Sequence, residues 1–166
     1  CGPKYFTYIN QELPTLCRRF FGIQPVPERT YIMGLSMGGY GAMKCAFTAP
    51  QQYAGCAGFS SVAEIQAELP QLCRWHEDQA IFPHGIVPPQ DDLFDLVEKF
   101  RDGTCPMPRL FLACGQQDSL YPANLRLRDT LQAMNWPLTW YEAPGDHNWF
   151  FWNDALGRAM KELLDN

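Results

Sequence analysis

The chain has 166 residues, of which 46% are hydrophobic and 19% charged, and its formal net charge is −5. This composition is typical of one folded domain with a substantial core and excludes a disordered tail. The sequence has no basic stripe or arginine cluster, and no apolar run approaches the roughly 18 to 20 residues that cross a bilayer. We therefore predict neither a nucleic-acid partner nor a membrane partner.

Seven cysteines are scattered singly along the chain, and no C-x-x-C pair occurs among them. This spacing supports neither a zinc site nor a thioredoxin-like redox motif. An odd number of thiols, several of them inside apolar runs, is typical of a reducing compartment, so we expect a cytoplasmic protein. Cys56 and Cys114 are interpreted as small buried hydrophobic residues.

The first predicted elements are a helix, a strand, a second helix and a second strand. Apolar residues at helical spacing predict a helix over 5–21, which Pro14 kinks or restarts. The β-branched and aromatic run 29–35 predicts a buried strand. A helix over 37–49 and a second buried strand over 53–60 follow.

The stretch 61–108 is the least regular part of the sequence, with one helix expected over 91–101. We interpret it as an insert-like segment of the kind that lines a site, inside a single domain over 1–166. The remaining predicted elements are strands over 109–115 and 138–143 and helices over 123–135 and 150–164. Strands separated by helices predict an α/β fold with a mainly parallel sheet and helices on both faces.

The run GLSMG at 34–38 fits the G-x-S-x-G pattern of a nucleophile elbow, between a predicted strand and a predicted helix. An abrupt turn there would force Ser36 into a strained backbone conformation. Side chains two residues on either side would then collide with backbone, which predicts the glycines Gly34 and Gly38. The Met37 N–H, at the helix N-terminus, would stabilise an oxyanion. The alternative interpretation is a glycine-rich tight turn without chemistry.

Two further residues are expected to complete a catalytic triad with Ser36. His147 lies just after the fourth predicted strand, and imidazole titrates in the range that a general base needs. Asp118 follows the third strand by a short loop, at the same edge of a parallel sheet, where it would orient His147. Asp146 is the alternative acid, although a residue adjacent to the base seldom faces its ring. Such a triad needs no metal and no cofactor.

Three segments together resemble the esterase D family of α/β-hydrolases, especially its bacterial tributyrin-esterase branch. They are GLSMGGYGA at 34–42, CGQQDSLY at 114–121 and PGDHNWFFW at 144–152. The resemblance implies hydrolysis of short-chain acyl esters through an acyl-enzyme. Because this family also includes S-formylglutathione hydrolases, feruloyl and acetyl xylan esterases and mycolyl transferases, the acyl group stays open. The alternatives are an acyltransferase and a catalytically silent fragment that serves as an interaction module.

The sequence departs from this family before the elbow. Members begin with several more strands, and an early loop donates the second N–H of the oxyanion hole, whereas only a helix and a proline-rich loop precede the strand at 29–35. We therefore expect roughly the C-terminal two-thirds of the fold. A missing N-terminal segment, or self-association through the exposed sheet edge, would complete it.

Several residues are candidates for a substrate pocket: Leu35, Trp75, Phe82 and Trp149. The aromatic run 149–152 beside His147 has two interpretations, since it could form an apolar wall for the acyl or alcohol group or anchor the last helix to the sheet. His76 and His84 fall in the irregular stretch and are interpreted as loop or surface residues.

Overall fold

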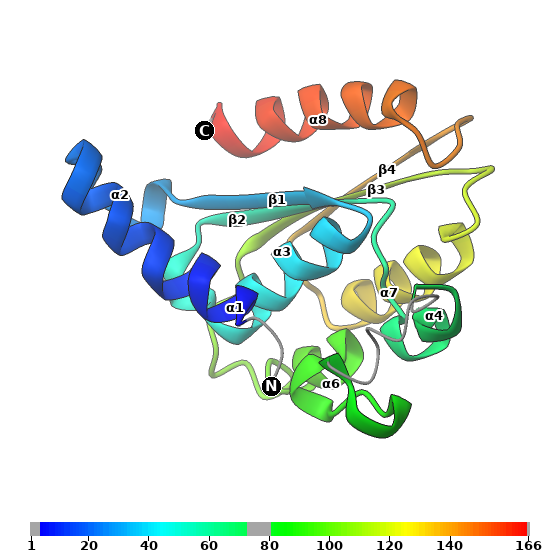
Figure 1. Ribbon diagram of the computed structural model, residues 1–166. Coiled ribbons are helices and arrows are strands. Elements are labelled where there is room, and N and C mark those ends of the chain that lie inside the picture. The colour runs from blue at the N-terminus through cyan, green and yellow to red at the C-terminus, as the bar shows by residue number, and fades with distance from the viewer. Residues whose placement is uncertain (1–3, 73–80, 166) are drawn as a thin grey trace.

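A four-stranded parallel sheet organises the computed structural model, which describes residues 4–72 and 81–165 (Figure 1). The strands lie in chain order and are β1 (Tyr31–Leu35), β2 (Gly55–Phe59), β3 (Arg109–Gly115) and β4 (Leu138–Ala143). Each neighbouring pair is parallel, so the carboxyl ends of all four strands meet at one edge. The predicted parallel sheet is therefore confirmed, and β3 and β4 have the predicted bounds.

Helices cover both faces of the sheet, as predicted. One face is packed by α3 (Met37–Thr48), α4 (Ile65–Leu72), α6 (Leu93–Glu98) and α7 (Tyr121–Ala133), and the other by α8 (Trp149–Leu164) (Figure 1). Helices α3, α4, α6 and α7 lie in the crossovers between strands, whereas α8 follows the last strand.

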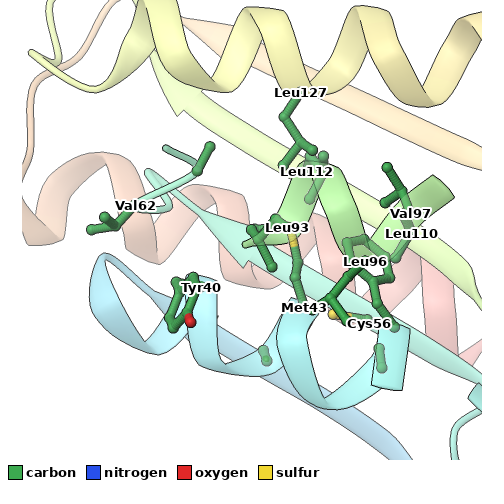
Figure 2. Packing of buried hydrophobic residues seen from close by; sticks show 14 of the residues in the cluster. Tyr40, Met43, Cys56, Val62, Leu93, Leu96, Val97, Leu110, Leu112 and Leu127 are labelled. Atoms are coloured by element: carbon green, nitrogen blue, oxygen red, sulfur yellow. The ribbon is translucent and has the colours of Figure 1, made fainter. Parts of the chain in front are cut away.

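The core is divided by the sheet into two layers because successive strand residues point to opposite faces. Leu110 and Leu112 of β3 belong to the cluster beneath α3 and α7, and Phe111 belongs to the cluster under α8. Figure 2 shows the first cluster, in which Met43 of α3 and Leu127 of α7 pack with Leu112. Burial on both faces is typical of parallel sheets.

The N-terminal helical stretch has three parts that follow one another without a break. The short helix α1 (Tyr5–Thr7) leads into the π-helical turn η1 (Tyr8–Glu12), and α2 (Leu13–Phe21) follows. Pro14 lies in the first turn of α2, and Glu12 before it already has helical backbone angles, so the helical path passes from the π-helical turn into α2 without an interruption at the proline. The π-helical turn has no counterpart among the predicted elements.

The stretch 61–108 is more regular than predicted. Besides α6, it contains α4 and the 3₁₀ turns η4 (Pro83–Gly85) and η5 (Pro89–Asp91). Helix α4 has only a weak signal in the sequence because it is short and carries a proline at position 70. The helix α6 begins later than predicted because Asp92 caps it, accepting hydrogen bonds from the N–H groups of Phe94 and Asp95. Two further 3₁₀ turns are η2 (Pro27–Arg29) and η3 (Pro50–Gln52).

Strand β1 pairs with β2 on one side only, so within residues 4–72 and 81–165 its outer edge has no partner strand. A groove of about 530 Å³ lies between the beginning of β1 and α2, with Leu13, Cys17 and Ile32 among its lining residues. Over the same described ranges, no helix combines the length and the apolar character that crossing a membrane requires.

Candidate active site

The turn between β1 and α3 holds Ser36 in a strained conformation, as the elbow motif predicts. Its backbone angles are φ 55° and ψ −123°, a region that residues with a side chain seldom occupy. The Ser36 N–H donates to the Phe59 carbonyl at 2.9 Å, and the Ser36 carbonyl accepts from the N–H groups of Gly39 and Val62 at 3.0 and 3.2 Å. These bonds keep the strained residue in place.

Of the two glycines that the elbow motif predicts, Gly34 is confirmed as a steric requirement and Gly38 is not. A Cβ at Gly34 would lie 2.1 Å from the Gly38 carbonyl oxygen, so this glycine is required. A Cβ at Gly38 would meet nothing within 4 Å, so the predicted collision at Gly38 is wrong. Gly39, which the motif does not single out, is restricted instead because its Cβ would lie 2.2 Å from Ser61 Oγ. A contact between two distant segments leaves no signal in the motif itself.

The structure brings Ser36, His147 and Asp118 together at the carboxyl edge of the sheet. His147, in the loop between β4 and α8, has its Nε2 at 3.0 Å from Ser36 Oγ. Its Nδ1 lies 2.8 Å from Asp118 Oδ2. The Asp118 side chain is fully buried, whereas the His147 side chain is 32% exposed. The imidazole thus bridges the hydroxyl of the partly buried Ser36 and a carboxylate in the interior.

The two candidate acids have separate environments. Asp118 Oδ1 accepts the N–H of Leu120 at 2.9 Å, which fixes the carboxylate and leaves Oδ2 for the imidazole. Asp146 is exposed, and its Oδ1 accepts the main-chain N–H of His147 at 2.7 Å. Asp118 is therefore the carboxylate that faces the ring, and Asp146 stabilises the turn.

The aromatic run after His147 divides between the two interpretations. Phe151 and Trp152 are buried and belong to the cluster between α8 and the sheet, whereas Trp149 and Phe150 are 63% and 92% exposed. The Trp152 ring lies edge-on to the His147 ring, with centroids 4.8 Å apart and an interplanar angle of 87°. Trp152, which is absent from the predicted site residues, therefore supports the imidazole from α8.

Two further pocket candidates, Leu35 and Phe82, lie on opposite faces of the sheet. Leu35 is partly buried and packs on the α8-side cluster, and Phe82 is buried in the cluster on the other face. The expectation that Phe82 offers its ring to a substrate is therefore corrected, because only 6% of it is exposed. His84 is exposed. Trp75 and His76 lie outside the described residues.

The N-terminus of α3 lies at Ser36, and the buried Cys114 thiol is a weaker candidate for a nucleophile than the Ser36 hydroxyl. Met37 is the first residue of α3, and N–H groups of the first turn have no partner within a helix. Burial, and secondarily the Asp118 carboxylate, raises the pKa of the Cys114 thiol to about 12. Among residues 4–72 and 81–165, no three His, Cys, Asp or Glu side chains are placed to hold a metal ion.

Comparisons with known proteins identify the family of the chain. A family model described as putative esterase matches residues 1–102, which is more than half of the chain. An acetyl esterase of Caldicellulosiruptor saccharolyticus is 28% identical over 168 residues, covering 95% of this chain and 63% of that protein.

Two solved structures from Staphylococcus aureus resemble most of the chain. One is an S-formylglutathione hydrolase, with 30% identity and a TM-score of 0.79, covering 96% of this chain and 60% of the other. The second, the substrate-bound fluorophosphonate-binding serine hydrolase F, has 29% identity and a TM-score of 0.88, covering 99% and 65%. The predicted α/β-hydrolase type is thereby confirmed, and the chain spans less than two-thirds of each of these relatives.

Proposed function

This chain belongs to the putative esterase family, and from that membership we propose that it provides the triad of a serine carboxylic ester hydrolase. Ser36 is the nucleophile, His147 the general base and acid, and Asp118 the residue that orients the imidazole. The observation that carries the proposal is the unbroken series of contacts from Ser36 Oγ to His147 Nε2 at 3.0 Å and from His147 Nδ1 to Asp118 Oδ2 at 2.8 Å.

In the acylation step, Ser36 Oγ attacks the ester carbonyl carbon while its proton passes to His147 Nε2. The buried Asp118 carboxylate stabilises the imidazolium that forms and keeps Nδ1 protonated. The tetrahedral intermediate collapses, the bond from carbon to the alcohol oxygen breaks, and His147 returns the proton to the leaving alcohol. An acyl group on Ser36 remains.

In the deacylation step, water attacks the acyl carbon while His147 Nε2 takes its proton. The oxyanion of both tetrahedral intermediates is stabilised by the Met37 N–H, at the N-terminus of the twelve-residue helix α3. As the second intermediate collapses, the bond from carbon to Ser36 Oγ breaks, His147 returns its proton to that oxygen, and the carboxylic acid is released. No step needs a metal or a cofactor.

We propose short-chain acyl esters as the substrate class. The supporting observations are the relatives, one an acetyl esterase and another an S-formylglutathione hydrolase. Trp149, at 63% exposed, is the predicted pocket residue that lies beside the His147 loop and is open to a ligand.

We also propose that further strands cover the open edge of β1, because the relatives are longer than this chain and a bare parallel edge invites pairing.

A fluorophosphonate probe tests the assignment of Ser36 directly, because it reacts only with an activated serine. We expect one adduct at Ser36 by mass spectrometry, and none in Ser36→Ala. Absence of an adduct in the wild-type protein would favour the silent interaction module and overturn the proposed activity.

A panel of acetyl, butyryl and octanoyl esters then tests the substrate class, with and without an added alcohol acceptor. We expect the fastest turnover with the short acyl groups and free acid as the product. Transfer of the acyl group to the alcohol in preference to water would replace the hydrolase by the acyltransferase alternative. Faster turnover of the octanoyl ester would contradict the short-chain assignment.

A further inference from the structure

The corner at residues 60–62 lies at the carboxyl end of β2 and contributes no residue to the proposed triad. It nevertheless forms hydrogen bonds with the elbow, with β3 and α7 beside the acid, and with α8 beside the base. Towards the nucleophile, the Val62 N–H donates to the Ser36 carbonyl at 3.2 Å. Towards β3, the Ser60 N–H donates to the Ala113 carbonyl at 2.7 Å. The corner is thus tied to the elbow on one side and to the strand of the acid on the other.

The connection to the acid runs through Asn124 of α7, whose side chain is fully buried. Its Oδ1 accepts the Ser61 N–H at 3.2 Å, and its Nδ2 donates to the carbonyls of Ser61 and Leu120 at 2.8 and 2.9 Å. Leu120 is the residue whose N–H holds Asp118 Oδ1. One amide therefore joins the corner to the turn that fixes the carboxylate.

The connection to the base runs through Trp152 of α8. Its Nε1–H donates to Ser60 Oγ at 3.1 Å, and its ring is the one that lies edge-on to His147. Ser60 is fully buried and has a positive φ of 45°. Ser60 Oγ thus lies towards α8, whereas the side chain of its neighbour Ser61 packs against α3.

Close packing holds the corner in place in addition to its hydrogen bonds. The Ser61 side chain occupies the space that a side chain on Gly39 of α3 or on Gly58 of β2 would need, because a Cβ at these two positions would lie 2.2 and 2.6 Å from Ser61 Oγ. The corner therefore cannot shift without moving α3, whose first turn adjoins Ser36. Its position relative to the nucleophile is set by packing as well as by hydrogen bonds.

We propose that the corner 60–62 sets the relative positions of the nucleophile, acid and base, with Asn124 and Ser60 as positioning residues. The inference rests on the proposed ester hydrolysis, because it concerns the geometry of that triad. Neither residue touches the reacting atoms. Each holds an element that carries a member of the triad, and displacements of about 1 Å at such elements can cost about 100-fold in rate.

The first test replaces Asn124 by alanine and measures ester turnover and the rate of fluorophosphonate labelling. Loss of the amide frees the turn of Asp118 from the corner, so we expect kcat and the labelling rate to fall between about 10- and 100-fold, with KM changed less than about twofold. Leu131→Ala is the matched control, since Leu131 is fully buried in the same helix and remote from the amide bridge. We expect Leu131→Ala to lower the denaturation midpoint and to leave kcat unchanged.

The outcomes separate the inference from the function on which it rests. If the wild-type protein is not labelled at Ser36, the proposed function fails and the inference fails with it. If the wild type is labelled and folded Asn124→Ala is labelled equally fast, the proposed function stands and the role of Asn124 is overturned. An equal fall in kcat for Leu131→Ala would also overturn that role, because stability alone would then explain the loss.

The second test uses variants that keep Asn124, and it decides the case should Asn124→Ala not fold. Ser60→Ala removes the acceptor of the Trp152 bond, Trp152→Phe removes the donor, and the double variant removes both. We expect each single variant to lower kcat several-fold and the double variant to be no slower than the slower single one. Independent, multiplicative losses in the double variant, or no loss in Ser60→Ala, would show that this bond does not position the base.

Discussion

Replacement of Gly34 by alanine isolates the steric requirement of the elbow. The new methyl group would lie 2.1 Å from the Gly38 carbonyl oxygen and 2.3 Å from its carbonyl carbon, whereas ordinary contacts begin at 3.4 Å. Because both contacts are with backbone, β1 and the first turn of α3 must separate. Such overpacking costs about 1–3 kcal/mol of unfolding free energy. The same displacement moves Ser36 relative to His147, so we expect labelling by fluorophosphonate to slow about 100-fold.

Gly38→Ala is the matched control in the same motif. A Cβ at Gly38 meets nothing within 4 Å, and the residue lies in a helix with negative φ. We expect its unfolding free energy to be unchanged or raised by about 0.4–1 kcal/mol, because alanine restricts the unfolded chain more than glycine does. Urea unfolding and labelling kinetics measure both effects. Equal losses in the two variants, or an unperturbed Gly34→Ala, would refute the steric argument.

Two further predictions concern the acid and the thiols. Asp118→Asn should lower ester turnover by up to roughly 10⁴-fold without unfolding the protein, because Asp118 orients His147. Asp146→Asn loses only a turn contact and should lower turnover far less. Comparable kcat values for the two variants would contradict the assignment of the acid. Burial raises the pKa of Cys45 to about 11 and that of Cys114 to about 12. We therefore expect iodoacetamide to modify the partly exposed Cys17 and Cys105 before Cys45 and Cys114, as peptide mass spectrometry would show. In the folded protein the raised pKa of Cys45 favours its neutral thiol. The free energy of unfolding is therefore unaffected by this group below about pH 9, and it falls as the pH rises further because the unfolded chain ionises the thiol more readily.

The sequence predicts Ser36, Asp118 and His147 because each lies directly after a predicted strand or a short loop beyond it. In a parallel sheet every strand ends at the same edge, so short loops after three strands have to meet there. The strained turn at Ser36 was predictable for a related reason, since a strand that passes at once into a helix leaves few backbone conformations. These inferences need only local signals and the topology of the sheet.

Features that depend on packing between distant segments could not be read from the sequence. Gly39 is restricted by Ser61, which lies more than twenty positions away, whereas Gly38 in the motif itself has open space. Phe82 was a pocket candidate because it is aromatic and lies in an irregular stretch, but the fold buries it in the core. Nothing local distinguishes an aromatic residue that fills a core from one that lines a pocket.

The order of the strands explains why the corner after β2 can hold the site without taking part in the chemistry. Strand β2 lies between β1 and β3, so its carboxyl end is flanked by the elbow on one side and the acid turn on the other. The base follows β4, which does not pair with β2, and short loops alone cannot join them. Helix α8 supplies the connection, because it packs across β2 and β3 and brings Trp152 back to Ser60. The parallel topology therefore makes this corner the place where main-chain and side-chain bonds can reach all three elements.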